Sequence, residues 1–288
     1  MLFRPLTAIF LFIVCAQLST LSHAQPFVFT AIPDEDETEL VERFSKVADY
    51  LSAELGIEVK YLPVKSYPAA VTAFRNNQVQ LAWFGGLTGV QARKLVPNSR
   101  AIAQGEEDQY FKSYFIAHRS SGPHPIEKLR DDIKGKTFTF GSKSSTSGRL
   151  MPEYFLREQF KQSPDQLFKK VGFSGNHSRT IALVQSGAYQ LGAVNYKVWE
   201  KEMAAGNIDT DNVSIIWTTP FYTDYQWTVR GDVNQRWGDH FIRRLTQALL
   251  NMKDPELLDA FPRKAFIPAS NKDYQAIADT AKSIGLMD

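Results

Sequence analysis

Cysteine is nearly missing from this chain of 288 residues. Its one copy, Cys15, falls within the first 24 residues. That stretch has the basic residue Arg4, an apolar run over residues 6–16 and the ending Ser22-His23-Ala24. Such a pattern is typical of a secretory signal peptide, and we expect cleavage after Ala24. The apolar run is too short for a membrane anchor, which needs roughly 20 residues. The exported chain then has no disulfide and no thiolate metal site.

An excess of charge of one sign is missing as well. The formal net charge is +2, from 33 Lys and Arg against 31 Asp and Glu, and no run of five like charges occurs. Nucleic acids and anionic membranes need a one-signed patch, so we expect neither as a partner. Recognition of a ligand therefore falls to a local site.

The densest acidic cluster is Asp34-Glu35-Asp36-Glu37. Acids are favoured at a helix start by the helix dipole, and we interpret this cluster as a solvated first turn. A metal site is the alternative, but no histidine or second carboxylate group follows with clear spacing. We expect no metal and no cofactor.

Short β-rich runs alternate with helical stripes along the chain. One stripe, Leu40 to Leu55, is stopped by Gly56, and the stripe from Trp237 to Met252 predicts a long late helix. Other helices are expected over 67–76 and 87–94, and strands over 27–31, 59–62, 79–84, 100–103, 137–140, 191–194 and 213–217. This alternation predicts α/β architecture with largely parallel sheets, whose ligands bind beyond the carboxyl ends of strands. Two further extended segments, 112–117 and 225–229, are candidate crossovers between two lobes.

The stretch "FGSKSSTSGRLMP", residues 140–152, places a hydroxyl cluster between a strand and a helix. Unpaired backbone N–H groups at a helix start favour an anion, and Ser145, Thr146 and Ser147 add hydroxyl donors. Pro152 fits the first turn of a helix that begins near residues 149–151. A simple helix cap and a nucleophile are the alternatives to this anion cradle.

A second strand-to-helix junction, "VGFSGNHSRT", carries His177 at the mouth of the next helix. An imidazole N–H there can donate to an anion oxygen. Ser145 or Ser147 with His177 could also act as nucleophile and base, but no G-x-S-x-G elbow, P-loop or suitably spaced acid supports catalysis. We therefore expect a binding protein and not an enzyme.

At these residues the chain resembles the phosphonate/phosphite/phosphate-type substrate-binding proteins of ABC importers, over essentially all of its length after residue 24. The resemblance is carried by "YLSAELGIEVKYLPVKSY", "NNQVQLAWFGG", "STSGRLMP" and "VGFSGNH". Three more stretches are most similar to the subgroup usually labelled putative selenate-binding: "AIPDEDETELVERF", "FGGLTGVQARKLVP" and "NYKVWE".

The resemblance implies a type II periplasmic binding protein, with two α/β lobes, two hinge strands and the ligand in the cleft between the lobes. Residues 25–116 and 225–288 would form lobe 1, and residues 117–224 would form lobe 2. It also implies periplasmic localisation and an inner-membrane ABC permease as partner, and we expect a monomer.

The resemblance further implies which residues grip a tetrahedral oxyanion. Lobe 1 would contribute Tyr67, the backbone N–H groups of Gly85 and Gly86, and the Thr88 hydroxyl. Lobe 2 would contribute Ser145, Thr146, Ser147 and His177.

Asn195-Tyr196-Lys197 stands where binders of amino-alkyl phosphonates carry an acid, which argues against an ammonium ligand. These contacts are all donors and suit a fully ionised oxyanion such as selenate or sulfate, unless Asp34, Glu35 or Asp224 reaches the cleft. Phosphite, phosphate and alkylphosphonates remain open as ligands. A sensory protein that docks on a receptor, and an exported phosphoester hydrolase using Ser147 and His177, are the alternative functions.

Overall fold

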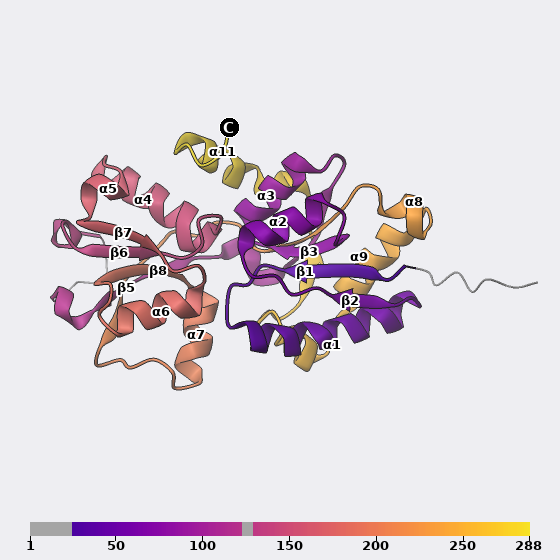
Figure 1. Ribbon diagram of the computed structural model, residues 1–288, viewed down its shortest axis with the longest axis horizontal. Helices are drawn as coiled ribbons and strands as arrows, with labels where there is room; N and C mark the ends of the chain where they lie inside the picture. Colours follow the sequence, from indigo (N-terminus) through magenta and orange to yellow (C-terminus); the bar gives the residue numbers. More distant parts are fainter. Residues whose placement is uncertain (1–24, 123–128) are drawn as a thin grey trace, which may run out of the picture.

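A computed structural model describes residues 25–122 and 129–288, so the predicted signal peptide lies outside the described residues. Two lobes lie side by side, each built on one β-sheet with helices packed against it (Figure 1). The chain starts in lobe 1, enters lobe 2 and returns to lobe 1. This is the two-lobe α/β arrangement expected from the sequence.

The sheet of lobe 1 has six strands in the order β11-β4-β10-β3-β1-β2. Their bounds are β1 (Phe27–Ala31), β2 (Val59–Tyr61), β3 (Leu81–Phe84), β4 (Arg100–Gly105), β10 (Gln226–Val229) and β11 (Phe266–Pro268). The helices of this lobe are α1 (Glu37–Leu55), α2 (Tyr67–Arg75), α3 (Gly86–Leu95), α8 (Val233–Trp237), α9 (Phe241–Asn251), α10 (Pro255–Leu258) and α11 (Gln275–Ser283).

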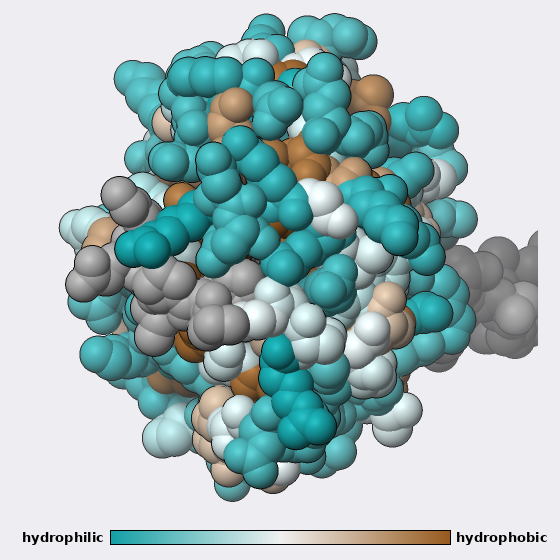
Figure 2. Space-filling model, turned by 90° about the vertical axis from the view of Figure 1, so that its left-hand side faces the viewer, coloured by the Kyte–Doolittle hydropathy of each residue, from teal (hydrophilic) through white to brown (hydrophobic). Residues whose placement is uncertain are grey.

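The sheet of lobe 2 has five strands in the order β7-β6-β8-β5-β9. Their bounds are β5 (Ser113–His118), β6 (Thr137–Phe140), β7 (Lys170–Phe173), β8 (Leu191–Asn195) and β9 (Val213–Thr218). The helices are a π-helical turn η4 (Thr146–Leu150), α4 (Met151–Phe160), α5 (Pro164–Leu167), α6 (His177–Gln185) and α7 (Tyr196–Ala204). The end of the molecule formed by this lobe presents mainly hydrophilic residues (Figure 2).

Both sheets are mixed, which corrects the expectation of largely parallel ones. β1 pairs in parallel with β2 and β3, and β6 pairs in parallel with β7 and β8. β10 runs antiparallel to both of its neighbours, and so does β5. These two are the strands by which the chain enters each sheet from the other lobe, so no βαβ crossover imposes a parallel direction on them.

The connections between the lobes differ from the predicted crossovers. Residues 112–117 belong almost wholly to β5, which pairs only within the sheet of lobe 2, so the predicted lobe boundary after residue 116 cuts a strand. The chain instead changes lobes just before β5 and again between β9 and β10, where Phe111 and Tyr222 form an isolated antiparallel bridge. We therefore propose that the lobe boundaries lie in these two connections.

Local signals placed most helices correctly. The predicted stripe of α1 is buried, and Gly56 ends the helix in the left-handed conformation with φ 68°. The late helix predicted from Trp237 to Met252 is α9, which begins only at Phe241, because Gly238, with a φ of 100°, separates it from the short helix α8.

Candidate functional site

The eight residues predicted to hold a ligand all lie where the lobes meet. Tyr67 is the first residue of α2, Gly85 is the N-cap of α3, and His177 is the first residue of α6. Ser145 is the N-cap of η4, Thr146 and Ser147 are its first two residues, and η4 continues into α4. The side chains of this set are nearly inaccessible, with exposed fractions from 0% to 2% for Tyr67, Thr88, Ser145, Thr146, Ser147 and His177. We call these eight residues the cradle.

The two halves of the cradle touch, so the lobes are closed in this structure. The Leu87 N–H donates to Thr146 Oγ1 over 3.0 Å, and the Thr88 hydroxyl donates to the Ser144 carbonyl over 2.9 Å. A Cβ on Gly85 would lie 3.3 Å from Thr146 Oγ1 and 3.1 Å from Asp224 Oδ1. Glycine at position 85 is therefore what allows this close approach.

The hydroxyls of the loop do different things. Ser145 Oγ accepts the Gly148 N–H over 2.9 Å, so this residue caps η4, as the cap alternative proposed. Thr146 joins the lobes, as described above. Ser147 Oγ lies 3.4 Å from His177 Nε2. The predicted start of the regular helix near residues 149–151 is confirmed by α4, with Pro152 in its first turn, but the sequence did not indicate the π-helical turn before it.

His177 is held as a neutral donor. Its Nδ1 accepts the Asn195 N–H over 3.2 Å, which places the ring proton on Nε2, facing Ser147. Burial lowers the pKa of His177 to about 4, although Glu35 acts in the opposite direction. The imidazole is thus uncharged at neutral pH and offers one N–H.

An acid lies against the cradle: Asp224, one of the three that the sequence left open. Asp224 is 1% exposed, and its Oδ1 accepts the Gly86 N–H over 2.8 Å. Burial raises the pKa of Asp224 to about 7. The hydrogen bonds with the Gly86 N–H and the Thr146 hydroxyl act in the opposite direction. The interlobe region thus contains an acceptor besides the donors that the resemblance implied, which is the exception that the sequence left open. No local pattern marks Asp224, because its partner Gly86 is 138 residues away.

Two polar atoms of this region have no hydrogen-bond partner among the described residues: Tyr67 Oη and Asp224 Oδ2. Asp34, Ser145 and Asp224 all lie near enough to Tyr67 to affect its pKa, which burial raises. A buried polar atom without a partner costs about 1–3 kcal/mol. A donor and an acceptor left open in one buried region are groups that a polar ligand could satisfy.

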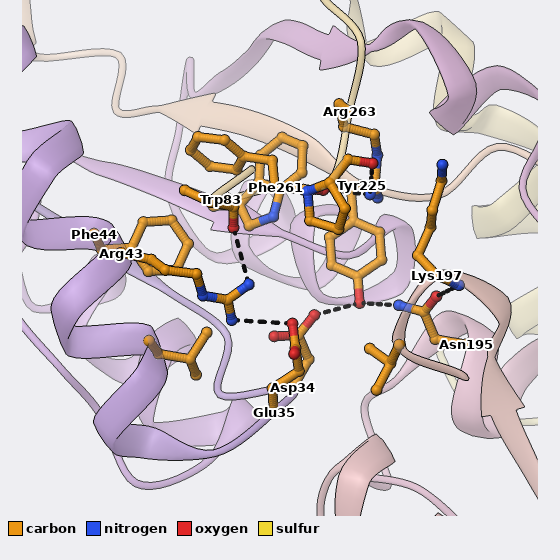
Figure 3. A pocket seen from close by; sticks show the side chains of 14 residues that line it. Asp34, Glu35, Arg43, Phe44, Trp83, Asn195, Lys197, Tyr225, Phe261 and Arg263 are labelled. Carbon is orange, nitrogen blue, oxygen red and sulfur yellow. Dashed lines mark hydrogen bonds and ion pairs between the residues drawn. The ribbon is translucent and has the colours of Figure 1, made fainter. Parts of the chain in front are cut away.

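A second hydrogen-bonded group, formed by Asp34, Asn195 and Tyr225, lies beside the cradle (Figure 3). The Tyr225 hydroxyl donates to Asp34 Oδ2 over 2.7 Å and accepts from Asn195 Nδ2 over 3.0 Å. Burial and the neighbouring Glu35 raise the pKa of Asp34 to about 6. The cavity that these residues line holds only about 20 Å³, close to the size of one water molecule. None of the eight cradle residues lines this cavity.

Two absences can be stated for residues 25–122 and 129–288. They contain no group of three or more His, Cys, Asp or Glu side chains placed to hold a metal ion. In the same ranges, every helix is too short or too polar to cross a membrane.

The fold and the interlobe site together define a periplasmic binding protein. A solved binding-protein component of an ABC phosphonate transporter from Pseudomonas aeruginosa has the same fold, with a TM-score of 0.78 and 20% identity over 89% of this chain and 85% of that one.

The family described as ABC transporter, phosphonate, periplasmic substrate-binding protein matches residues 29–274, and the chain belongs to it. It is the substrate-binding component of an ABC transporter, as the resemblance implied.

Two relatives are informative. The probable ABC transporter phosphite binding protein PhnD1 of Prochlorococcus marinus (strain MIT 9301) is 43% identical over 261 residues, which is 88% of each chain. The structure of that PhnD1 in complex with methylphosphonate matches with a TM-score of 0.86, over 90% of this chain and 98% of that one. The phosphonates-binding periplasmic protein of Escherichia coli K12 is 25% identical over 67% of this chain and 57% of its own length.

Proposed function

We propose that this protein captures a small phosphorus oxyanion, of the size of phosphite or methylphosphonate, in the cradle between its lobes. The observation that carries the proposal is the open Oδ2 of Asp224 among donors from both lobes. A carboxyl in that place shares a proton with the ligand. Phosphate-like oxyanions still titrate near neutral pH and can supply that proton.

The same carboxyl argues against the selenate-like alternative. Selenate and sulfate carry no proton at neutral pH, so a charged Asp224 repels them without compensation. They would bind only to the protonated acid.

The relatives support a phosphorus ligand. The relative with 43% identity is named a phosphite binding protein, and its structure was solved with methylphosphonate. Similarity at this level over 88% of both chains makes the same ligand class the best expectation for this protein.

The geometry favours binding without turnover. The hydrolase alternative needs His177 to take a proton from Ser147, but the hydrogen bond from the Asn195 N–H to Nδ1 leaves Nε2 already protonated. The Nδ1 that a catalytic acid would orient is occupied by this backbone N–H.

We further propose that residues 1–24 are removed on export and that the protein binds its ligand as a monomer. The closed form would be the one that docks on the permease.

The experiment is a thermal-shift and calorimetry panel with phosphite, methylphosphonate, phosphate, sulfate and selenate. At about a thousand times its Kd, phosphite or methylphosphonate should raise the free energy of unfolding of this protein by about 4 kcal/mol. Asp224→Asn keeps an oxygen for the Gly86 N–H but replaces the open acceptor by a donor. We expect about thirtyfold weaker binding of phosphite by this variant, and unchanged or stronger binding of sulfate and selenate.

Asp36→Asn is the matched control, because Asp36 caps α1 in the same interlobe region and asparagine caps a helix equally well. The proposal fails when no phosphorus oxyanion shifts the melting temperature of the wild type. It also fails when Asp224→Asn weakens sulfate and phosphite alike.

A further inference from the structure

The acidic turn between β1 and α1 is only half solvated: Asp36 and Glu37 are exposed, as expected from the sequence, whereas Asp34 and Glu35 are buried. Glu35 is only 5% exposed, and its two carboxylate oxygens have different partners. Oε1 accepts from Arg43 Nη2 over 3.0 Å, within lobe 1. Oε2 accepts from Lys201 Nζ over 2.5 Å, and Lys201 lies on α7 of lobe 2. One carboxylate thus pairs with a cation from each lobe.

Lys201 also pairs with Glu39 on the first turn of α1. The start of α1 and the helix α7 face each other across the interlobe gap (Figure 1). In the closed form two acids, Glu35 and Glu39, are balanced by two cations, Arg43 and Lys201. Opening the lobes removes Lys201 and leaves the two acids with one cation.

The same turn makes backbone contacts with the cradle. The His177 N–H donates to the Asp34 carbonyl over 2.9 Å, and Asn176 Nδ2 donates to the Glu35 carbonyl over 3.3 Å. Asn176 is the N-cap of α6, which begins with His177. The ion pairs of Lys201 and the position of His177 therefore depend on one short segment.

We propose that Lys201 is a positioning residue: its ion pairs with Glu35 and Glu39 form an interlobe clasp that favours the closed cradle and so tightens oxyanion binding. The inference rests on the proposed function. A contact that exists only in the closed form shifts the balance between open and closed forms, and a ligand that needs both lobes gains affinity by the same factor.

Neither lobe needs the Lys201 ion pairs in order to fold. Glu35 keeps Arg43 when Lys201 is lost, so no buried charge remains alone in lobe 1. The Lys201 side chain is 33% exposed, so its removal leaves no buried cavity. Partial exposure also limits the effect, since exposed ion pairs contribute little and buried ones much more.

The test is Lys201→Gln, measured by calorimetry and stopped-flow with phosphite and with methylphosphonate. We expect a Kd about tenfold higher, arising mainly from faster dissociation, with the melting temperature of the ligand-free protein unchanged. Lys201→Arg should restore most of the affinity. The matched control is Lys65→Gln, which breaks the 2.5 Å pair of Lys65 with Glu37 on the same turn but within lobe 1. Its Kd should stay within twofold of the wild type.

A double-mutant cycle with Glu35→Gln isolates the interlobe pair. The loss in the double variant should be smaller than the sum of the two single losses, because both changes remove the Glu35–Lys201 contact while only Lys201→Gln also removes the contact with Glu39. Small-angle scattering of the ligand-free protein should show a more open average form for Lys201→Gln.

Three results would overturn the clasp while leaving the proposed function intact: wild-type affinity in Lys201→Gln, equal losses in Lys65→Gln and Lys201→Gln, or additive losses in the cycle. A wild type that binds none of the oxyanions contradicts the proposed function first.

Discussion

The two lobes contribute different chemistry to the same site. Lobe 2 offers side-chain donors at helix starts, the Ser145–Ser147 loop and the neutral His177. Lobe 1 and the connection that returns to it contribute Tyr67 and the acid Asp224, while the Gly86 and Leu87 N–H groups at the start of α3 donate to Asp224 and Thr146. We propose that lobe 2 recognises negative oxygens in general, whereas the Asp224 side recognises the proton and so the kind of anion.

The largest expected effect on ligand binding comes from a substitution at Thr146, where the two halves of the cradle are in contact. Thr146→Val keeps the shape but removes the oxygen that accepts the Leu87 N–H and lies near Asp224. Buried groups on both lobes then lose a partner, so we expect the Kd for phosphite to rise about a hundredfold. Isothermal calorimetry measures it.

Ser144→Ala is the control for that variant, because only the backbone carbonyl of Ser144 serves the opposite lobe. Unchanged affinity in Thr146→Val would remove this loop from the site.

The next largest effect on binding is expected at Gly85, where Asp224 and Thr146 approach the backbone closely. Its φ of −71° suits any residue, so Gly85→Ala changes only the space between Asp224 and Thr146. We expect about tenfold weaker binding for alanine and a larger loss for serine, because overpacking holds the lobes apart. Equal Kd values for the wild type, Gly85→Ala and Gly85→Ser would show that this approach is not needed for binding.

The smallest expected effect is on the pH dependence of the unfolding free energy, and it comes from Asp224. Burial raises the pKa of Asp224 to about 7, from 3.8, so the folded form retains a proton that the unfolded chain has lost. That stabilisation is complete below pH 3.8 and disappears as the pH rises through about 7. From pH 6 to 8.5 the ligand-free wild type should therefore lose about 1 kcal/mol of unfolding free energy relative to Asp224→Asn.

Urea titrations across that range measure the difference. His177 does not interfere, because burial lowers its pKa to about 4 and its contribution changes mainly below pH 6.5. Parallel curves for the two proteins would mean that Asp224 is not shifted as its burial implies.

The sequence predicted what depends on neighbours along the chain. The alternation of short strands and amphipathic helices indicated two α/β lobes, and Gly56 and Pro152 marked a helix end and a helix start where the structure has them. The hydroxyl loop and His177 were found because helix starts and caps have local signatures.

Only the tertiary structure decided which charges are buried and with what. Asp224 approaches Gly86, and Glu35 approaches Lys201, across 138 and 166 residues of chain. The acidic turn at residues 34–37 has the composition of a solvated helix start, yet the packing of lobe 2 against it buries Glu35. The environment of a carboxyl group depends on what the fold brings to it, and that environment is what sets its charge and its partner.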